Sequence, residues 1–120
     1  MKKLLLIQSS PRGKDSISRT LTNELLERLR EKEEVQITER DLSVNPLPHL
    51  QAEQLAAFYT PPAQRSGGLQ DAVKLSDEVV GELLKADIVV ISAPIWNFSL
   101  PSVLKAWIDH VVRAGITFSY

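Results

Sequence analysis

The fold is decided by residues 4–18, LLLIQSSPRGKDSIS. An apolar run, Leu4–Ile7, is followed almost at once by a polar segment, residues 9–18, that holds four serines, one glycine and two basic residues. A continuous apolar run of this length is typical of a strand that is covered on both faces. Turn-forming and polar residues directly after such a strand predict a loop at the edge of a sheet.

Strand and helix patterns alternate along the rest of the chain. We expect further strands at Val35–Thr38, with one wetter face, and at Ile88–Ile91, with a short helix at Gln51–Tyr59. Residues 65–68 are expected to form a loop. Three longer helices are indicated by apolar residues at helical spacing: Leu21, Leu25, Leu26 and Leu29; Ala72, Leu75, Val79, Val80 and Leu83; and Leu104, Trp107, Ile108, Val111 and Val112.

This order of elements predicts an α/β fold, in which a doubly wound parallel sheet carries helices on both faces. Pro101 suits the first turn of the last helix, and Gly115 suits its C-terminal cap. The chain of 120 residues is long enough for one domain, which we expect to cover residues 1–120.

Composition narrows the classes of function. Hydrophobic residues make up 43% of the chain, charged residues 24%, and the formal net charge is −1, so nothing points to nucleic acid or to an anionic membrane. The absence of cysteine excludes disulfides, thiolate metal sites and thiol nucleophiles. No apolar run approaches the roughly 20 residues of a membrane span or the roughly 7–15 of a secretory core. We therefore expect a cytoplasmic protein.

The polar segment after the first strand, residues 9–18, is called the serine loop below. Ligands of doubly wound sheets bind beyond the carboxyl ends of the strands, and a helix N-terminus there favours phosphate. Hydroxyl groups from Ser10, Ser16 and Ser18 would add donors, and Arg12 and Lys14 would add charge at the rim. The loop has neither the Gly-rich dinucleotide pattern nor the Gly-Lys-Ser/Thr of NTPases, so we predict a mononucleotide phosphate. The alternative is that the serines only cap a helix, through Ser16 or Ser18, and solvate a turn.

A second loop, residues 94–101, follows the third strand and reaches the same edge. Trp96, Asn97 and Phe98 lie between two prolines that restrict its backbone. An aromatic ring beside an amide can hold the face and the edge of a flat heterocycle. The alternative is that an aromatic side chain closes the core, which the sequence favours for Phe98 more than for Trp96.

The remaining ionisable candidates give no catalytic pair and no metal site. His49 follows a proline in a loop and is expected to be exposed, and His110 is expected on the solvated flank of the last helix. The histidines are too far apart in sequence to suggest metal-ligand spacing. The carboxylates Asp77 and Glu78 are expected on a solvated helix face.

Together these motifs resemble the FMN-dependent NADH azoreductases, which belong to the flavodoxin-like quinone reductases. The resemblance is carried by Ser10, Ser16-Ile17-Ser18, Pro94-Ile95-Trp96-Asn97-Phe98 and Pro101. It extends over essentially the whole chain, because Asp41-Leu42, Asn45-Pro46 and residues 113–120 fit the same pattern. The family usually has methionine at the position of Ile95.

The resemblance implies a cofactor site and a reaction. Hydride would pass from NADH to FMN and then, in a separate step of a ping-pong cycle, to a quinone or an azo compound, and no side chain would need to act as a strong acid or base. The alternative is a non-catalytic electron carrier of flavodoxin type or an inactive fragment of the fold, although carriers are usually markedly acidic. The implied FMN phosphate contacts are Ser10, Ser16, Ile17 and Ser18; the implied isoalloxazine contacts are Ile95, Trp96, Asn97 and Phe98; the residues near the substrate are Asn97 and Tyr120.

The resemblance also bears on the extent of the fold. The family continues through two more strands, so the chain is expected to be the N-terminal part of a three-layer α/β/α fold, truncated after the third strand and its helix. Ile88–Ile91, apolar throughout, would then be an exposed edge strand, which is a template for aggregation. Since the family is dimeric, we expect a homodimer, a larger assembly or a poorly soluble product.

Overall fold

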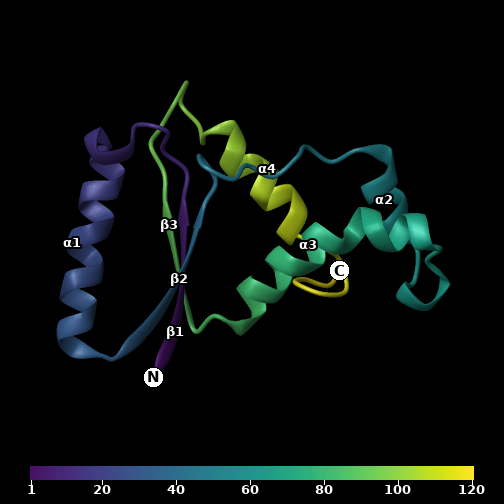
Figure 1. The fold of residues 1–120 in the computed structure, drawn as a ribbon, viewed down its shortest axis with the longest axis horizontal. Coiled ribbons are helices and arrows are strands. Elements are labelled where there is room, and N and C mark those ends of the chain that lie inside the picture. The colour runs from purple at the N-terminus through teal and green to yellow at the C-terminus, as the bar shows by residue number, and fades with distance from the viewer.

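The computed structural model describes residues 1–120, and its centre is a parallel sheet of three strands (Figure 1). The strands are β1 (Lys2–Gln8), β2 (Val35–Asp41) and β3 (Ile88–Ser92), in the order β2-β1-β3. Leu5 of β1 pairs with Thr38 on one side and with Val89 on the other. The chain thus adds one strand to each side of β1, which confirms the predicted doubly wound arrangement.

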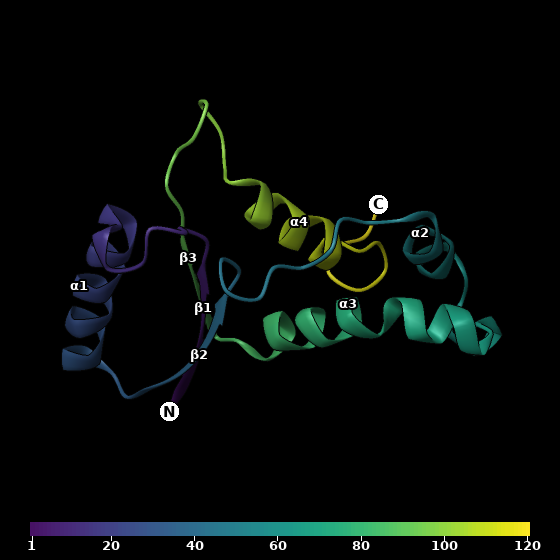
Figure 2. The ribbon, with the colours of Figure 1, turned by 45° about the horizontal axis from the view of Figure 1, so that its top comes forward.

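Helices cover both faces of the sheet and make three layers (Figure 2). On one face, Leu4 and Leu6 pack with Leu26 of α1 (Ile17–Lys32). On the other face, Leu5 and Ile7 pack with α3 (Gly67–Lys85) and α4 (Ser102–Val111). None of the side chains of Leu4–Ile7 is more than 3% exposed. Burial on both faces explains why all four of these positions are apolar.

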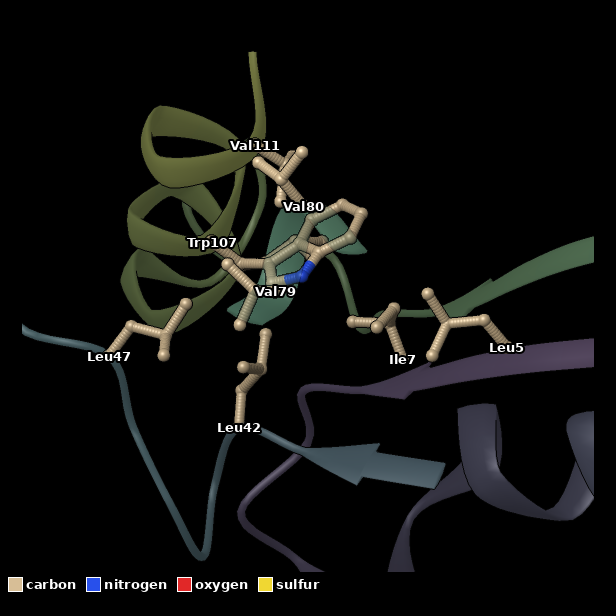
Figure 3. Packing of buried hydrophobic residues seen from close by; sticks show 9 residues of the cluster. Leu5, Ile7, Leu42, Leu47, Val79, Val80, Trp107 and Val111 are labelled. Carbon is tan, nitrogen blue, oxygen red and sulfur yellow. The ribbon is translucent and has the colours of Figure 1, made fainter. Parts of the chain in front are cut away.

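The larger core surrounds Trp107 of α4 (Figure 3). The indole packs with Val79 and Val80 of α3 and with Leu42 and Leu47 of the segment after β2. Its Nε1–H is buried and has no hydrogen-bond acceptor in the protein. The core therefore depends on the fit of the ring rather than on a polar contact of the indole.

Two of the helices outside the sheet each begin at a hydrogen bond between a side chain and a backbone N–H. The short helix α2 (Ala52–Tyr59) confirms the prediction, and the side chain of Gln54 accepts a hydrogen bond from the Gln51 N–H. The expectation of a loop at residues 65–68 is wrong for Gly67 and Gly68, because α3 already begins at Gly67. The Ser66 hydroxyl caps this helix, and the cap compensates for two residues of low helix propensity. Single turns of 3₁₀ helix occur at Gly13–Asp15 and Pro62–Gln64.

The apolar face of α1 differs from the prediction. Thr22 and Leu26 are buried and Leu29 packs partly against the sheet, whereas Leu21 and Leu25 are exposed. The predicted stripe is wider than the surface that three strands offer, so only one side of it is covered. Ile17, Leu21 and Leu25, which recur at every fourth position, form an exposed apolar line on the helix.

Predictions for the end of α4 need three corrections. His110 is only 2% exposed, because it lies three residues after Trp107 on the inward side; its Nε2–H donates to the Pro48 carbonyl at 2.8 Å. Val112 is exposed, because the helix ends at Val111. Gly115 does not cap the helix but has a φ of 83° in the turn that follows, where its N–H donates to the Phe118 carbonyl.

The outer edge of β3 is unpaired, as predicted. Val89 and Ile91 of this strand are exposed on the α3 and α4 face of the sheet, beyond the cover of those helices. None of the helices combines the length and the apolar character needed to cross a membrane.

Candidate functional site

The loops after β1 and β3 are tied together at the carboxyl edge of the sheet (Figure 1). The Ser9 hydroxyl donates to the carbonyl of Ser92 at 2.8 Å, and the Ser92 hydroxyl donates to the carbonyl of Ser18 at 3.1 Å. No sequence motif marks Ser9 or Ser92, although Ser9 directly follows one apolar strand and Ser92 ends another. These two bonds hold the serine loop beside the loop of residues 94–101.

The serine loop ends in an open helix N-terminus. Ser16 is the N-cap of α1, and its Oγ accepts from the Arg19 N–H at 3.3 Å and lies 2.9 Å from Ser18 Oγ. The capping role of Ser16 is thereby confirmed. The N–H groups of Ile17 and Ser18 donate to no protein acceptor, and the side chains of Arg12 and Lys14 are exposed nearby in sequence. Free N–H groups, paired hydroxyls and a positive helix end form a donor set that suits a phosphate.

Ser10 lies at the buried side of this loop and is only 1% exposed. Its Oγ accepts from the Arg12 N–H at 3.3 Å, and its carbonyl accepts from the guanidinium of Arg19 at 2.6 and 3.2 Å. The hydroxyl and the carbonyl of Ser10 are therefore held by residues of the loop or of the first turn of α1. Ile17, in contrast, has an exposed side chain, so only its backbone is suited to an anion.

The loop after β3 contains a tight hairpin. Trp96 and Ser99 exchange two backbone hydrogen bonds of 2.9 Å each, and the two residues between them have positive φ: 51° for Asn97 and 66° for Phe98. This is the pattern of a two-residue type I′ turn, which usually carries Asn-Gly. A bulky side chain in this left-handed region costs about 1–2 kcal/mol. The turn is not evident from the sequence because phenylalanine stands where glycine is the usual signal.

The hairpin turns its aromatic side chains outward. Phe98 lies at the tip and is fully exposed, so the alternative that it closes the core is wrong. Trp96 is 42% exposed and Ile95 is also exposed, which agrees with the prediction that Trp96 lies outside the core. A strained turn that presents uncovered aromatic rings is typical of a functional site.

Two clefts flank α4. The β3–α4 cleft, of about 720 Å³, is lined by Trp96, Asn97, Ser99 and Pro101 together with the exposed His49. The α2–α4 cleft, of about 750 Å³, is lined mainly by apolar residues, among them Phe58, Ile108, Phe118 and Tyr120. Leu50 and Asp109 line both clefts. Asn97 and Tyr120 thus lie in neighbouring clefts rather than in one.

Arg113 forms the buried wall of the α2–α4 cleft and was not singled out from the sequence. Its guanidinium donates to Asp77 Oδ1 at 2.6 Å and to Ser76 Oγ at 3.2 Å, and it lies 4.5 Å from the centre of the Phe58 ring. Asp77 remains half exposed despite this pair, in line with its predicted place on a wet helix face. Arg113 therefore joins α2, α3 and the end of α4 at one point. The chain contains no group of three or more His, Asp or Glu residues arranged to hold a metal ion.

Comparisons with known proteins agree with this architecture. The chain is 48% identical to the FMN-dependent NADH:quinone oxidoreductase 2 of Pseudomonas putida over 121 residues, an alignment that covers 100% of this chain and 61% of the relative. Its fold matches the crystal structure of an azoreductase from Bacillus anthracis strain Sterne with a TM-score of 0.89 and 28% identity, over 100% of this chain and 60% of the other.

A third match is an FMN-dependent NADH-azoreductase from Bacillus anthracis strain Ames Ancestor, solved in complex with FMN. Its TM-score is 0.82 at 26% identity, and the match covers 98% of this chain and 59% of the other. The chain thus spans about three fifths of the length of the proteins it matches. A family model described as a flavodoxin-like fold matches residues 2–120. With its parallel sheet and its serine loop at the carboxyl edge, the chain belongs to this flavodoxin-like family.

Proposed function

We propose that this protein is an FMN-dependent oxidoreductase that passes hydride from NADH to quinones or azo compounds. The observation that carries the proposal is the free N-terminus of α1 in the serine loop, tied through Ser92 to the loop that carries Trp96 and Asn97. The names of the matched relatives support the same cofactor and the same classes of substrate.

The residues of the two loops fit the two ends of FMN. The N–H groups of Ile17 and Ser18, with the hydroxyls of Ser10, Ser16 and Ser18, would hold the phosphate. The exposed segment Ile95–Phe98 would flank the isoalloxazine ring, with the Asn97 amide at its polar edge. Bound FMN would supply the hydride transfer itself. The protein would contribute binding and orientation, so no residue is assigned as a catalytic acid or base.

Substrate would bind beside this ring, in the two clefts that flank α4. Asn97 lines one cleft and Tyr120 the other, and Leu50 and Asp109, which line both, make the two clefts neighbours. Open clefts beside the ring suit a ping-pong cycle, because the nicotinamide can leave before the acceptor enters. We further propose that residues 1–120 act as one FMN-binding domain and that the protein works in the cytoplasm.

Titration with FMN and with riboflavin tests the cofactor and its orientation. We expect the purified chain to bind FMN, and we expect Trp96→Ala to weaken FMN and riboflavin by the same factor, about tenfold, because stacking on an aromatic ring contributes about 1–3 kcal/mol and does not involve the phosphate. Leu84→Ala, which removes an exposed apolar side chain from α3 outside both clefts, is the control and should change neither affinity.

Two outcomes would contradict these assignments. If the parent chain bound no flavin, the proposed cofactor would be wrong. If Trp96→Ala weakened FMN alone, Trp96 would belong at the phosphate end of the site rather than beside the ring.

We also propose that two copies of the chain associate. Exposed apolar residues gather at the α2–α4 cleft, including Tyr59, Val112, Ile116 and Tyr120, and contiguous apolar surface of this kind marks interaction sites. Light scattering on the eluate of a size-exclusion column should give at least twice the chain mass of 13.4 kDa. A monomer with full flavin occupancy would show that association is not needed for cofactor binding and would overturn this proposal.

A further inference from the structure

Arg19, in the first turn of α1, does not extend into solvent. Its guanidinium turns back across the serine loop, where Nη2 and Nε donate to the Ser10 carbonyl at 2.6 and 3.2 Å. The same group pairs with Asp41, with Nη1 3.0 Å from Oδ2 and Nη2 3.1 Å from Oδ1, and it donates to Ser43 Oγ at 3.0 Å. One side chain thus connects the serine loop, the start of α1 and the end of β2.

The carboxylate that receives Arg19 is itself fixed in place. Asp41 is the last residue of β2, and its Oδ1 accepts from the N–H of Ser43 at 3.0 Å and from the Ser43 hydroxyl at 2.6 Å. Desolvation alone would raise the pKa of the Asp41 carboxyl, but hydrogen bonds from Arg19 and Ser43 outweigh it and hold this pKa below its usual range. Asp41 therefore stays ionised at neutral pH.

These contacts matter for an anion at the serine loop. The Ser10 carbonyl accepts two hydrogen bonds from the Arg19 guanidinium, so its oxygen is turned toward Arg19. Because Arg19 is in turn held by Asp41 and Ser43, this carbonyl cannot reorient without breaking several contacts. The backbone before Pro11 is then held in one conformation, which removes part of the ordering cost of binding.

We propose that Arg19 is a positioning residue that, anchored by Asp41 and Ser43, holds the Ser10 backbone so that the serine loop is preformed for a phosphate. The inference rests on the proposed function only in taking that phosphate to be the FMN phosphate. Arg19 acts through Ser10 and is not itself assigned as a phosphate contact.

A second arginine provides a matched comparison. Arg40 of β2 is buried to a similar extent and pairs with Glu82 of α3 at 2.7 and 2.8 Å and with Glu78 at 3.3 Å. All these partners are side chains of one helix on the other face of the sheet, and none belongs to the serine loop. Arg40→Gln should therefore lower stability without acting on a phosphate site.

The test measures FMN and riboflavin affinities of the parent, Arg19→Gln, Arg19→Lys and Arg40→Gln, together with urea unfolding of each. We expect Arg19→Gln to weaken FMN about tenfold, the scale of one lost hydrogen bond to a charged group, and to change riboflavin less than about twofold. Arg19→Lys should recover part of the loss, because an ammonium can reach the carbonyl or the carboxylate but does not form the same fork. Arg40→Gln should shift the unfolding midpoint and keep the parent ratio of the two affinities.

The outcomes separate the two proposals. If the parent binds neither flavin, the proposed function fails and the positioning role fails with it. If the parent prefers FMN and Arg19→Gln keeps that preference, or loses both flavins equally, the positioning role alone is overturned. Ser43→Ala, which removes one partner of Arg19 and one of Asp41, provides the same test should Arg19→Gln not fold, with an expected loss for FMN of about threefold.

Discussion

Replacing Trp107 with alanine is expected to lower the free energy of unfolding by about 3–5 kcal/mol. The indole is 4% exposed and packs with α3 and with the segment after β2, so its removal leaves a cavity at the junction of α3, α4 and the sheet. Elements on both sides of that cavity are held by other contacts and would close it only in part. Urea unfolding followed by circular dichroism measures the change.

Trp107→Phe separates the role of ring volume from that of the indole nitrogen. Phenylalanine keeps most of the packing and deletes the Nε1–H, which is buried without an acceptor in the parent. Removing an unsatisfied buried donor offsets part of the stability that is lost with the ring volume. We therefore expect this variant to lose less than half of the unfolding free energy that the alanine variant loses. Equal losses for the two variants would show that the nitrogen has a partner or that the site tolerates no change of shape.

The double substitution Ser16→Ala with Ser18→Ala is expected to weaken FMN by about 1–3 kcal/mol, roughly 5- to 150-fold. The two hydroxyls lie 2.9 Å apart at the N-terminus of α1, where a phosphate would accept from both. Riboflavin, which lacks the phosphate, should lose far less. Isothermal titration with both flavins measures the difference.

Loss of the Ser16 cap also destabilises α1, so a control for stability is needed. Ser66→Ala removes the equivalent N-cap of α3, far from the serine loop, and should lower stability by about 0.5–2 kcal/mol without changing FMN affinity. A double variant that binds FMN like the parent would mean that the phosphate is held elsewhere.

What the sequence predicts well is local or periodic. The run Leu4–Ile7 predicts the central strand because a strand buried on both faces needs apolar side chains at every position. Ser16 is predictable as a cap because capping involves residues only three apart. The same holds for the placement of both loops at one edge, since parallel strands all end there.

What the sequence does not predict depends on distant partners or on unusual turn chemistry. The partners of Arg19 include Asp41, and those of Arg113 include Asp77, and no pattern in one sequence links such positions. His110 was assigned to a wet flank because a polar residue beside an apolar stripe is usually solvated, whereas here the Pro48 carbonyl accepts from it. Core burial of Phe98 is an alternative in the sequence because an aromatic side chain can close a core, whereas the Asn-Phe turn, which lacks the glycine signal, places it at an exposed tip.

The chain's two tryptophans lie in opposite environments. Trp107 is enclosed by aliphatic side chains, whereas Trp96 stands half exposed in the hairpin. In fluorescence terms they are two separate reporters: a water-soluble quencher such as iodide reaches the indole of Trp96 but not that of Trp107. Emission that resists the quencher follows the integrity of the core during unfolding. Emission that the quencher removes follows what happens at the hairpin, so the unlabelled protein distinguishes loss of fold from occupation of its site.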